Sequence, residues 1–163
     1  RNFPGASYHA VYEAGYSGFW VHDQLTEKGV ACTVANPADV PTKDKERRKK
    51  RDRVDCRKLA RSLRAGEIEG IYVPCRQKLE DRSLVRTRQS MVRKQTRCKN
   101  QIKSILLFYG IAIPEDWAER RWSGPFVKWL ESLPMERASG EVTLRIHVEE
   151  LKHLREILAR LDG

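Results

Sequence analysis

The stretch Lys49-Lys50-Arg51-Asp52-Arg53-Val54-Asp55-Cys56 places two carboxylates three residues apart at the end of a dense basic run. Residues i and i+3 of a helix share a face, with Cβ atoms roughly 5–6 Å apart. Two carboxylates at this spacing repel each other unless a cation lies between them. That cation can be an arginine or a divalent metal ion, and the pair alone does not distinguish the two.

A helix is predicted to begin at this pair. Gly66 gives a stop signal, and apolar residues recur before it at helical spacing, at Val54, Cys56, Leu59, Ala60 and Leu63. An aspartate at the N-cap with an acid three residues later resembles a capping box, and acids in a first turn suit the helix dipole. Asp52 and Asp55 therefore fit a helix cap as well as a metal site.

A strand, a helix and a second strand are predicted ahead of the basic run. Residues 8–14 are rich in strand formers, residues 19–29 fit a short helix, and residues 30–35 form a strand that ends at Asn36-Pro37. This order within about 30 residues is typical of a βαβ unit with parallel strands. Ligands gather at the carboxyl ends of such strands, where Glu13 falls. A solvated glutamate in a turn is the alternative.

The composition favours a polyanionic partner. The 163 residues include 32 Lys and Arg against 22 Asp and Glu, a net charge of +10. Nucleic acid is the first candidate and an anionic membrane surface the second. No apolar run reaches the length of a membrane span, and no leader-like segment opens the chain, so we expect an intracellular protein without a membrane partner.

The four cysteines, Cys32, Cys56, Cys75 and Cys98, form no CxxC or CxxH motif. This spacing excludes a zinc knuckle and predicts reduced, mostly buried thiols.

Two basic segments supply candidate contacts to nucleic acid. Residues 38–51 have no apolar periodicity and are predicted to form a solvated loop, and residues 78–109 are predicted to form a long helix. Between Arg82 and Lys103 this helix carries eight cations and no acid, whereas solvated helices usually mix their charges. An acidic protein is the alternative partner. The candidate residues are Arg47, Arg48, Lys49, Lys50, Arg51, Arg86, Arg88, Arg93, Lys94, Arg97, Lys99 and Lys103.

The last third of the chain is predicted to be helical. A short helix with a proline near its start is predicted at residues 125–131. Trp117 and Trp122 precede it and Trp129 lies within it, and the three are expected to anchor it by packing against a longer helix. Stacking on bases is the alternative. Residues 142–161 carry leucines and a valine at alternating steps of three and four, a heptad-like seam. Its partner is the basic helix of the same chain or a second copy, which would give a homo-oligomer. His147 and His153 are too far apart for an i,i+4 metal pair and are expected at the surface or the seam.

Three motifs in this order resemble the DEDD transposases of bacterial insertion sequences, the RuvC-like family guided by a bridge RNA. They are Tyr12-Glu13-Ala14-Gly15, Val34-Ala35-Asn36-Pro37 and the run from Arg51 to Ala60. The resemblance continues through 84–88 and 99–102 to Gly110-Ile111. It implies an α/β fold, with a partial RNase H-like (RuvC-like) domain at residues 1–76 and a basic helical or coiled-coil region at 77–163. It also implies a bacterial, cytoplasmic, nucleoid-associated protein.

The resemblance assigns Glu13, Asp52 and Asp55 to a catalytic Mg²⁺ site, and DNA and a guide RNA as partners. Hard cations prefer carboxylate oxygens, and paired ions promote phosphoryl transfer. The family's first aspartate, on a strand before the glutamate, and its later serine-bearing domain have no match here.

We therefore expect a fragment of a transposase that moves an insertion sequence by RNA-guided strand exchange. On this expectation, the chain alone binds nucleic acid without catalysis. The rival hypothesis is a non-enzymatic, basic helical nucleic-acid-binding module that dimerises through its C-terminal helix.

Overall fold

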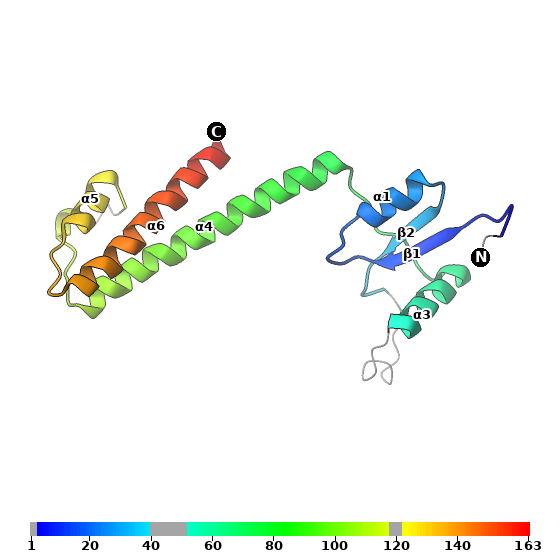
Figure 1. Cartoon of the computed structure of the whole chain (residues 1–163), viewed down its shortest axis with the longest axis horizontal. Coiled ribbons are helices and arrows are strands. Elements are labelled where there is room, and N and C mark those ends of the chain that lie inside the picture. Colours follow the sequence, from blue (N-terminus) through cyan, green and yellow to red (C-terminus); the bar gives the residue numbers. More distant parts are fainter. Residues whose placement is uncertain (1–2, 40–51, 118–121) are drawn as a thin grey trace. The chain divides into compact units, whose positions relative to one another are not determined.

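The computed structural model describes residues 3–39, 52–117 and 122–163, with the backbone alone at residues 52 and 53. The chain divides into two compact units, Arg1–Cys75 and Arg76–Gly163, and Figure 1 shows the elements of each. The division lies beside the boundary expected at residue 76. Each unit has its own apolar cluster and is described by itself.

A parallel βαβ arrangement builds the first unit. Strands β1 (His9–Glu13) and β2 (Ala31–Ala35) pair in parallel, with Glu13 opposite Ala35, and helix α1 (Trp20–Glu27) connects them. Gly29 turns the chain after α1 with a φ of 76°, a left-handed conformation that favours glycine. The predicted strand, helix and strand are thus confirmed within one or two residues.

Helix α3 (Asp52–Ala65) covers one face of these strands and α1 covers the other (Figure 1). The hydroxyl of Tyr12 donates to the carbonyl of Gly18, just ahead of α1, at 3.0 Å. Val11 instead packs against the buried cluster that Ala35 of β2 and Leu59 of α3 form. Because side chains alternate along a strand, Glu13 shares the α3 face with Val11.

An extended segment follows α3 and pairs with β2. Gly70 forms an antiparallel bridge with Ala35, and the amide of Ile71 donates to the carbonyl of Val34 at 2.8 Å. These backbone hydrogen bonds hold the residues after α3 against β2.

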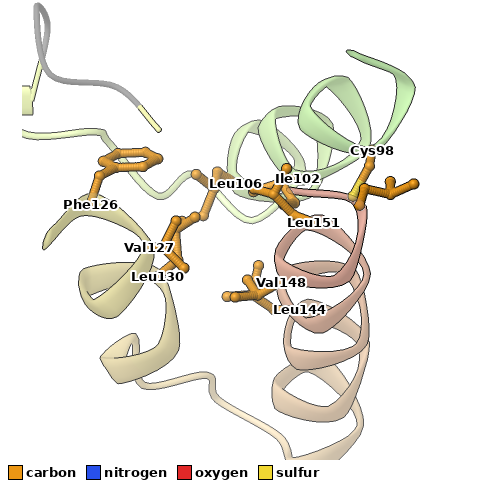
Figure 2. Packing of buried hydrophobic residues seen from close by; sticks show 10 residues of the cluster. Cys98, Ile102, Leu106, Phe126, Val127, Leu130, Leu144, Val148 and Leu151 are labelled. Atoms are coloured by element: carbon orange, nitrogen blue, oxygen red, sulfur yellow. The ribbon is translucent and has the colours of Figure 1, made fainter. Parts of the chain in front are cut away.

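Three helices and one turn build the second unit over residues 76–117 and 122–163. Helix α4 (Arg76–Phe108) lies along α6 (Ala138–Asp162), a 3₁₀ turn spans Glu115–Trp117, and α5 (Gly124–Ser132) contacts α6. The predicted helices at 78–109, 125–131 and 142–161 are confirmed. Figure 2 shows the core of this unit, which consists of Cys98, Ile102, Leu106, Phe126, Val127, Leu130, Leu144, Val148, Leu151 and Leu154. The seam of α6 thus has its partners, α4 and α5, in the same chain.

The three tryptophans pack around one phenylalanine of α5. The ring centroids of Trp117, Trp122 and Trp129 lie 5.9, 5.4 and 5.3 Å from that of Phe126. The packing role predicted for them is confirmed.

One prediction needs correction. Of the four cysteines, all free, only Cys98 is buried, because the described part of the first unit offers few buried positions to the other three.

The apolar residues of α4 pack only in its second half, since Val85 and Val92 are exposed. Helix α6 ends at Asp162, opposite Arg88, so it does not extend along the first turns of α4.

No helix in the described ranges combines the length and the apolar character that a bilayer span requires.

Candidate functional site

A cavity of about 770 Å³ lies between β1 and α3. Glu13, at the carboxyl end of β1, and Asp55, in the first turn of α3, both line it. Asp55 is half-buried and Glu13 is exposed. The structure therefore brings two of the three predicted carboxylates to one cavity, whereas the side chain of Asp52 lies outside the described residues.

One apolar contact explains why these carboxylates come together. Leu59 is buried and packs against Val11 and Ala35, which fixes α3 against the strands. Asp55 lies one helical turn before Leu59, on the same face of α3. Glu13 lies two residues after Val11, on the same face of β1. Packing of these two faces therefore brings both carboxylates to the same side. Position 52 is one further turn back on α3.

The donor set of this cavity suits a hard cation. Within the described residues, neither Glu13 nor Asp55 forms an ion pair or accepts a hydrogen bond, so their oxygens are available. Arg64 and His9 also line the cavity, and the apolar walls come from Val11, Leu59, Ala60 and Leu63. Carboxylate oxygens are the protein groups that Mg²⁺ prefers.

A second candidate surface lies on α4 and is called the arginine stripe. A helix turns about 100° per residue, so the residues of the stripe fall within about 60° of arc around the axis of α4. The centre of this arc lies about 170° from the buried face of Cys98, Ile102 and Leu106. All are exposed, and none forms an ion pair with another described residue. The stripe consists of Arg82, Arg86, Arg93 and Arg97.

Arg88 differs from the stripe because a carboxylate already engages it. Its Nε and Nη2 donate to the two carboxylate oxygens of Asp162 at 2.5 and 3.3 Å. This pair raises the pKa of Arg88 and holds the pKa of Asp162 below its usual value. Arg88 thus makes an interhelical contact in this structure, and its contact to nucleic acid stays a prediction.

A compact basic cluster surrounds Trp122. The Nζ atoms of Lys99 and Lys103 lie 5.7 and 5.9 Å from the centroid of its ring, and Arg155 donates to its backbone carbonyl. Burial, together with the charges of Arg155 and Lys103, lowers the pKa of Lys99. Sequence reasoning missed Arg155 because its position on α6 predicted only an outer, solvated residue.

The basic residues Arg47, Arg48, Lys49, Lys50 and Arg51 lie outside the described residues. Lys94 is exposed on α4, beside the arginine stripe.

Comparison with known proteins gives a consistent set of similarities. The model of a transposase family, the DEDD transposases of IS110 type, matches residues 7–111. The chain is 31% identical over 138 residues to "Putative transposase y4qE" of Sinorhizobium fredii, covering 85% of the chain and 34% of that protein. It is 33% identical over 108 residues to "Putative transposase y4rJ" of the same organism, covering 63% and 27%.

A third relative is the transposase for insertion sequence element IS1533 of Leptospira borgpetersenii, 26% identical over 156 residues and covering 94% of the chain and 44% of the relative. The chain therefore spans less than half the length of each of these relatives. No solved structure gives a significant match.

Proposed function

The chain belongs to the transposase family of IS110 type, and on that premise we propose that it carries part of the catalytic domain and a nucleic-acid-binding arm of a DNA transposase. In the whole protein the proposed reaction is strand exchange on DNA, guided by an RNA, which moves an insertion sequence within the bacterial nucleoid. By itself, the proposed role of this chain is to bind nucleic acid without cutting or joining it. The proposal of a catalytic domain rests on one observation, that Glu13 and Asp55 line the same cavity.

Glu13, Asp52 and Asp55 are the proposed ligands of catalytic Mg²⁺. Glu13 and Asp55 line one cavity, and residue 52 lies one turn before Asp55 on the same helix, which supports this set. When bound at such a site, the metal activates an attacking oxygen and stabilises a leaving one at phosphorus. The contribution of the chain is to hold the carboxylates through the apolar cluster of Leu59, Ala35 and Val11.

The edge of β1 that faces away from β2 supports the proposal of a larger, RNase H-like sheet. Among the described residues, β1 pairs with β2 alone, so its other edge is available to a further strand. The apolar wall of Leu59, Ala60 and Leu63 lies beside that strand. We propose that the remaining aspartate of the family's carboxylate set joins the site at this edge in the whole protein.

The arginine stripe is the proposed contact to the DNA or guide RNA backbone. Its guanidinium groups have no carboxylate partner among the described residues and point away from the core of the second unit. Phosphate contacts of this kind depend strongly on salt, because binding releases the condensed counterions of the nucleic acid. The cluster of Lys99 and Lys103 at Trp122 and the basic residues 47–51 extend the proposed interface.

The binding test measures fluorescence anisotropy of labelled duplex DNA and of structured RNA over a range of salt concentrations. We expect the combined change Arg86→Ala, Arg93→Ala and Arg97→Ala to weaken binding at least tenfold at low salt. The slope of log affinity against log salt should fall by about 2 to 3, since each lost phosphate contact removes about 0.7–0.9.

The matched control removes two arginines that already have acidic partners. Arg76 and Arg145 pair with Glu80 and Glu141 at 3.1 and 2.5 Å, so Arg76→Ala with Arg145→Ala should change the affinity little. An equal loss in the control would contradict a specific role of the stripe. Affinity for an acidic protein that nucleic acid does not compete away would favour the alternative partner.

The metal test measures Mn²⁺ binding by electron paramagnetic resonance, with Mn²⁺ in place of Mg²⁺. Glu13→Gln and Asp55→Asn should each weaken binding severalfold, whereas Glu69→Gln, an exposed acid of the same unit, should not. Unchanged affinity in both variants contradicts the proposed site. Mg²⁺-dependent cutting or joining of DNA by this chain contradicts the proposal that it is inactive alone.

The rival function is a non-enzymatic module, and the separate core of the second unit favours it. Dimerisation through the seam of α6 conflicts with the burial of Leu144, Val148 and Leu151 within the chain. A homo-oligomer would instead use Leu84, Val85 and Val92, which are exposed on α4. Light scattering of the full chain, with Val85→Glu as the variant, tests this surface.

A further inference from the structure

Three chemically distinct donor groups converge between α4 and α6. They come from residues other than those that line the carboxylate cavity. They are the thiol of Cys98 on α4 and the imidazole and carboxylate of His147 and Glu150 on α6. Their donor atoms all lie within 4.8 Å of one another. The second unit holds all three residues, so the cluster rests on packing within that unit alone.

One ring nitrogen of His147 lacks a hydrogen-bond partner among the described residues. This atom, Nδ1, is buried, and Oε2 of Glu150 lies 3.6 Å from it, beyond hydrogen-bond distance. The side chain as a whole is 23% exposed, so the rest of the ring remains accessible. Buried polar atoms are nearly always satisfied in folded proteins, which makes this nitrogen a candidate ligand atom.

Cys98 is held beside this nitrogen by the fold. Its side chain is 1% exposed, and its Sγ donates to the backbone carbonyl of His147 at 3.2 Å. Figure 2 shows Cys98 at the end of the apolar core, where α4 and α6 meet. The thiol is therefore positioned by α4 next to two donors that are three residues apart on one face of α6.

The donor set selects a class of metal. Mg²⁺ and Ca²⁺ take oxygen ligands and do not favour sulfur, whereas Zn²⁺ binds thiolate, imidazole and carboxylate together. Zinc bonds of about 2.0–2.3 Å place the ligand atoms of a tetrahedral site about 3–4 Å from each other. Side-chain rotations that move the three donor atoms by roughly 1 Å would therefore bring them to the distances that zinc requires. Three protein ligands leave the fourth position for water.

We propose that Cys98, His147 and Glu150 form a zinc site that joins α4 to α6. The thiol gives up its proton to become the thiolate ligand, and that proton passes to solvent. The site links residues 49 positions apart in the chain and so stabilises the packing that presents the arginine stripe. This proposal does not depend on the transposase reaction.

The test titrates Co²⁺ into the full, reduced and metal-free chain, with Co²⁺ as a coloured substitute for Zn²⁺. A thiolate ligand gives a sulfur-to-cobalt charge-transfer absorption, which Zn²⁺ should abolish by competition at one ion per chain. We expect Cys98→Ser to remove this absorption, and His147→Gln and Glu150→Gln each to weaken Co²⁺ binding at least tenfold. Zn²⁺ should also raise the melting temperature of the wild-type chain.

Matched controls separate this cluster from incidental binding. Cys75, His153 and Glu149 are exposed residues of the same three types. Cys75→Ser, His153→Gln and Glu149→Gln should leave the absorption and the affinity unchanged. Loss of the absorption in Cys75→Ser, its persistence in Cys98→Ser, or its absence from the wild-type chain overturns the proposal. If Cys98→Ser fails to fold by circular dichroism, wild-type affinity in both other variants overturns it equally.

Discussion

Leu59 has no chemical role in the candidate carboxylate site, yet its packing positions the site. It joins α3 to Val11 and Ala35, and the two carboxylates are close in sequence to that contact. Asp55 was predicted from its spacing to Asp52, and Glu13 from its place at a strand end. Their meeting in one cavity depended on a leucine that the sequence marked only as part of a helical stripe.

Cys98 allows a prediction at the scale of one residue. Burial, followed by the influence of Glu150, raises the pKa of its thiol to about 11. Because thiolate is the reactive form, only about 0.1% of such a thiol is reactive at pH 8. In metal-free chain at pH 8, we expect iodoacetamide to modify Cys98 at least tenfold more slowly than Cys75, as measured by peptide mass spectrometry.

The direction of the pH dependence follows from the raised pKa. Modification of Cys98 should accelerate as the pH rises toward 11, because more of the thiol ionises. In denaturant, where burial is lost, Cys98 and Cys75 should react at similar rates. Equal rates in the native chain at pH 8 would show that Cys98 is not held in the buried position described.

At the scale of the element, α4 has two halves with different environments. Its second half packs on α6, and its first half, with Leu84 and Val85 at 53% and 54% exposure, does not. The Arg88–Asp162 pair marks the division. Periodicity predicted the helix correctly but not this division, because the length of α6 and its alignment with α4 determine where the contact ends.

Leu151 and Leu107 form a matched pair for testing the helical core. Leu151 is fully buried on α6, whereas Leu107 is 82% exposed near the end of α4. Leu151→Ala should lower the free energy of unfolding by about 2–5 kcal/mol, through lost burial and the resulting cavity. Leu107→Ala should change it by about 0.5 kcal/mol or less. Urea unfolding followed by circular dichroism measures both, and similar losses would contradict the described core.

At the scale of the whole molecule, the two units differ in the size of their cores. Among its described residues, the second unit buries ten in one cluster. In the described part of the first unit, the buried hydrophobic residues are Val34, Ala35 and Leu59. Small cores give marginal stability, because little apolar surface is buried relative to the chain that must be ordered.

Hydrogen exchange of the full chain tests this difference. We expect backbone amides of β1 and β2 to exchange at least tenfold faster, after correction for intrinsic rates, than those around Ile102 and Leu151. The exposed first turns of α4 serve as an internal control, since they should exchange faster than the second half of the same helix. Equal protection across both units would show that they unfold together.

The sequence by itself determined the elements and the candidate carboxylates of this protein. Strand alternation, helical periodicity, glycine stops and the spacing of Asp52 and Asp55 are local properties, because they depend on backbone geometry over a few residues. The motif order from Glu13 to Ala60 led to the family that the comparisons show.

Only the tertiary structure decided which distant residues meet. The pairing of α6 with α4 brings these residues together. The Arg88–Asp162 contact joins residues 74 positions apart, and in the cluster Cys98 meets His147 and Glu150, which lie 49 and 52 positions further along the chain. The spacing of His147 and His153 had argued against a metal pair, and the histidine instead faces a cysteine of another helix. Such meetings depend on the alignment of packed helices, which side-chain packing sets and no local pattern records.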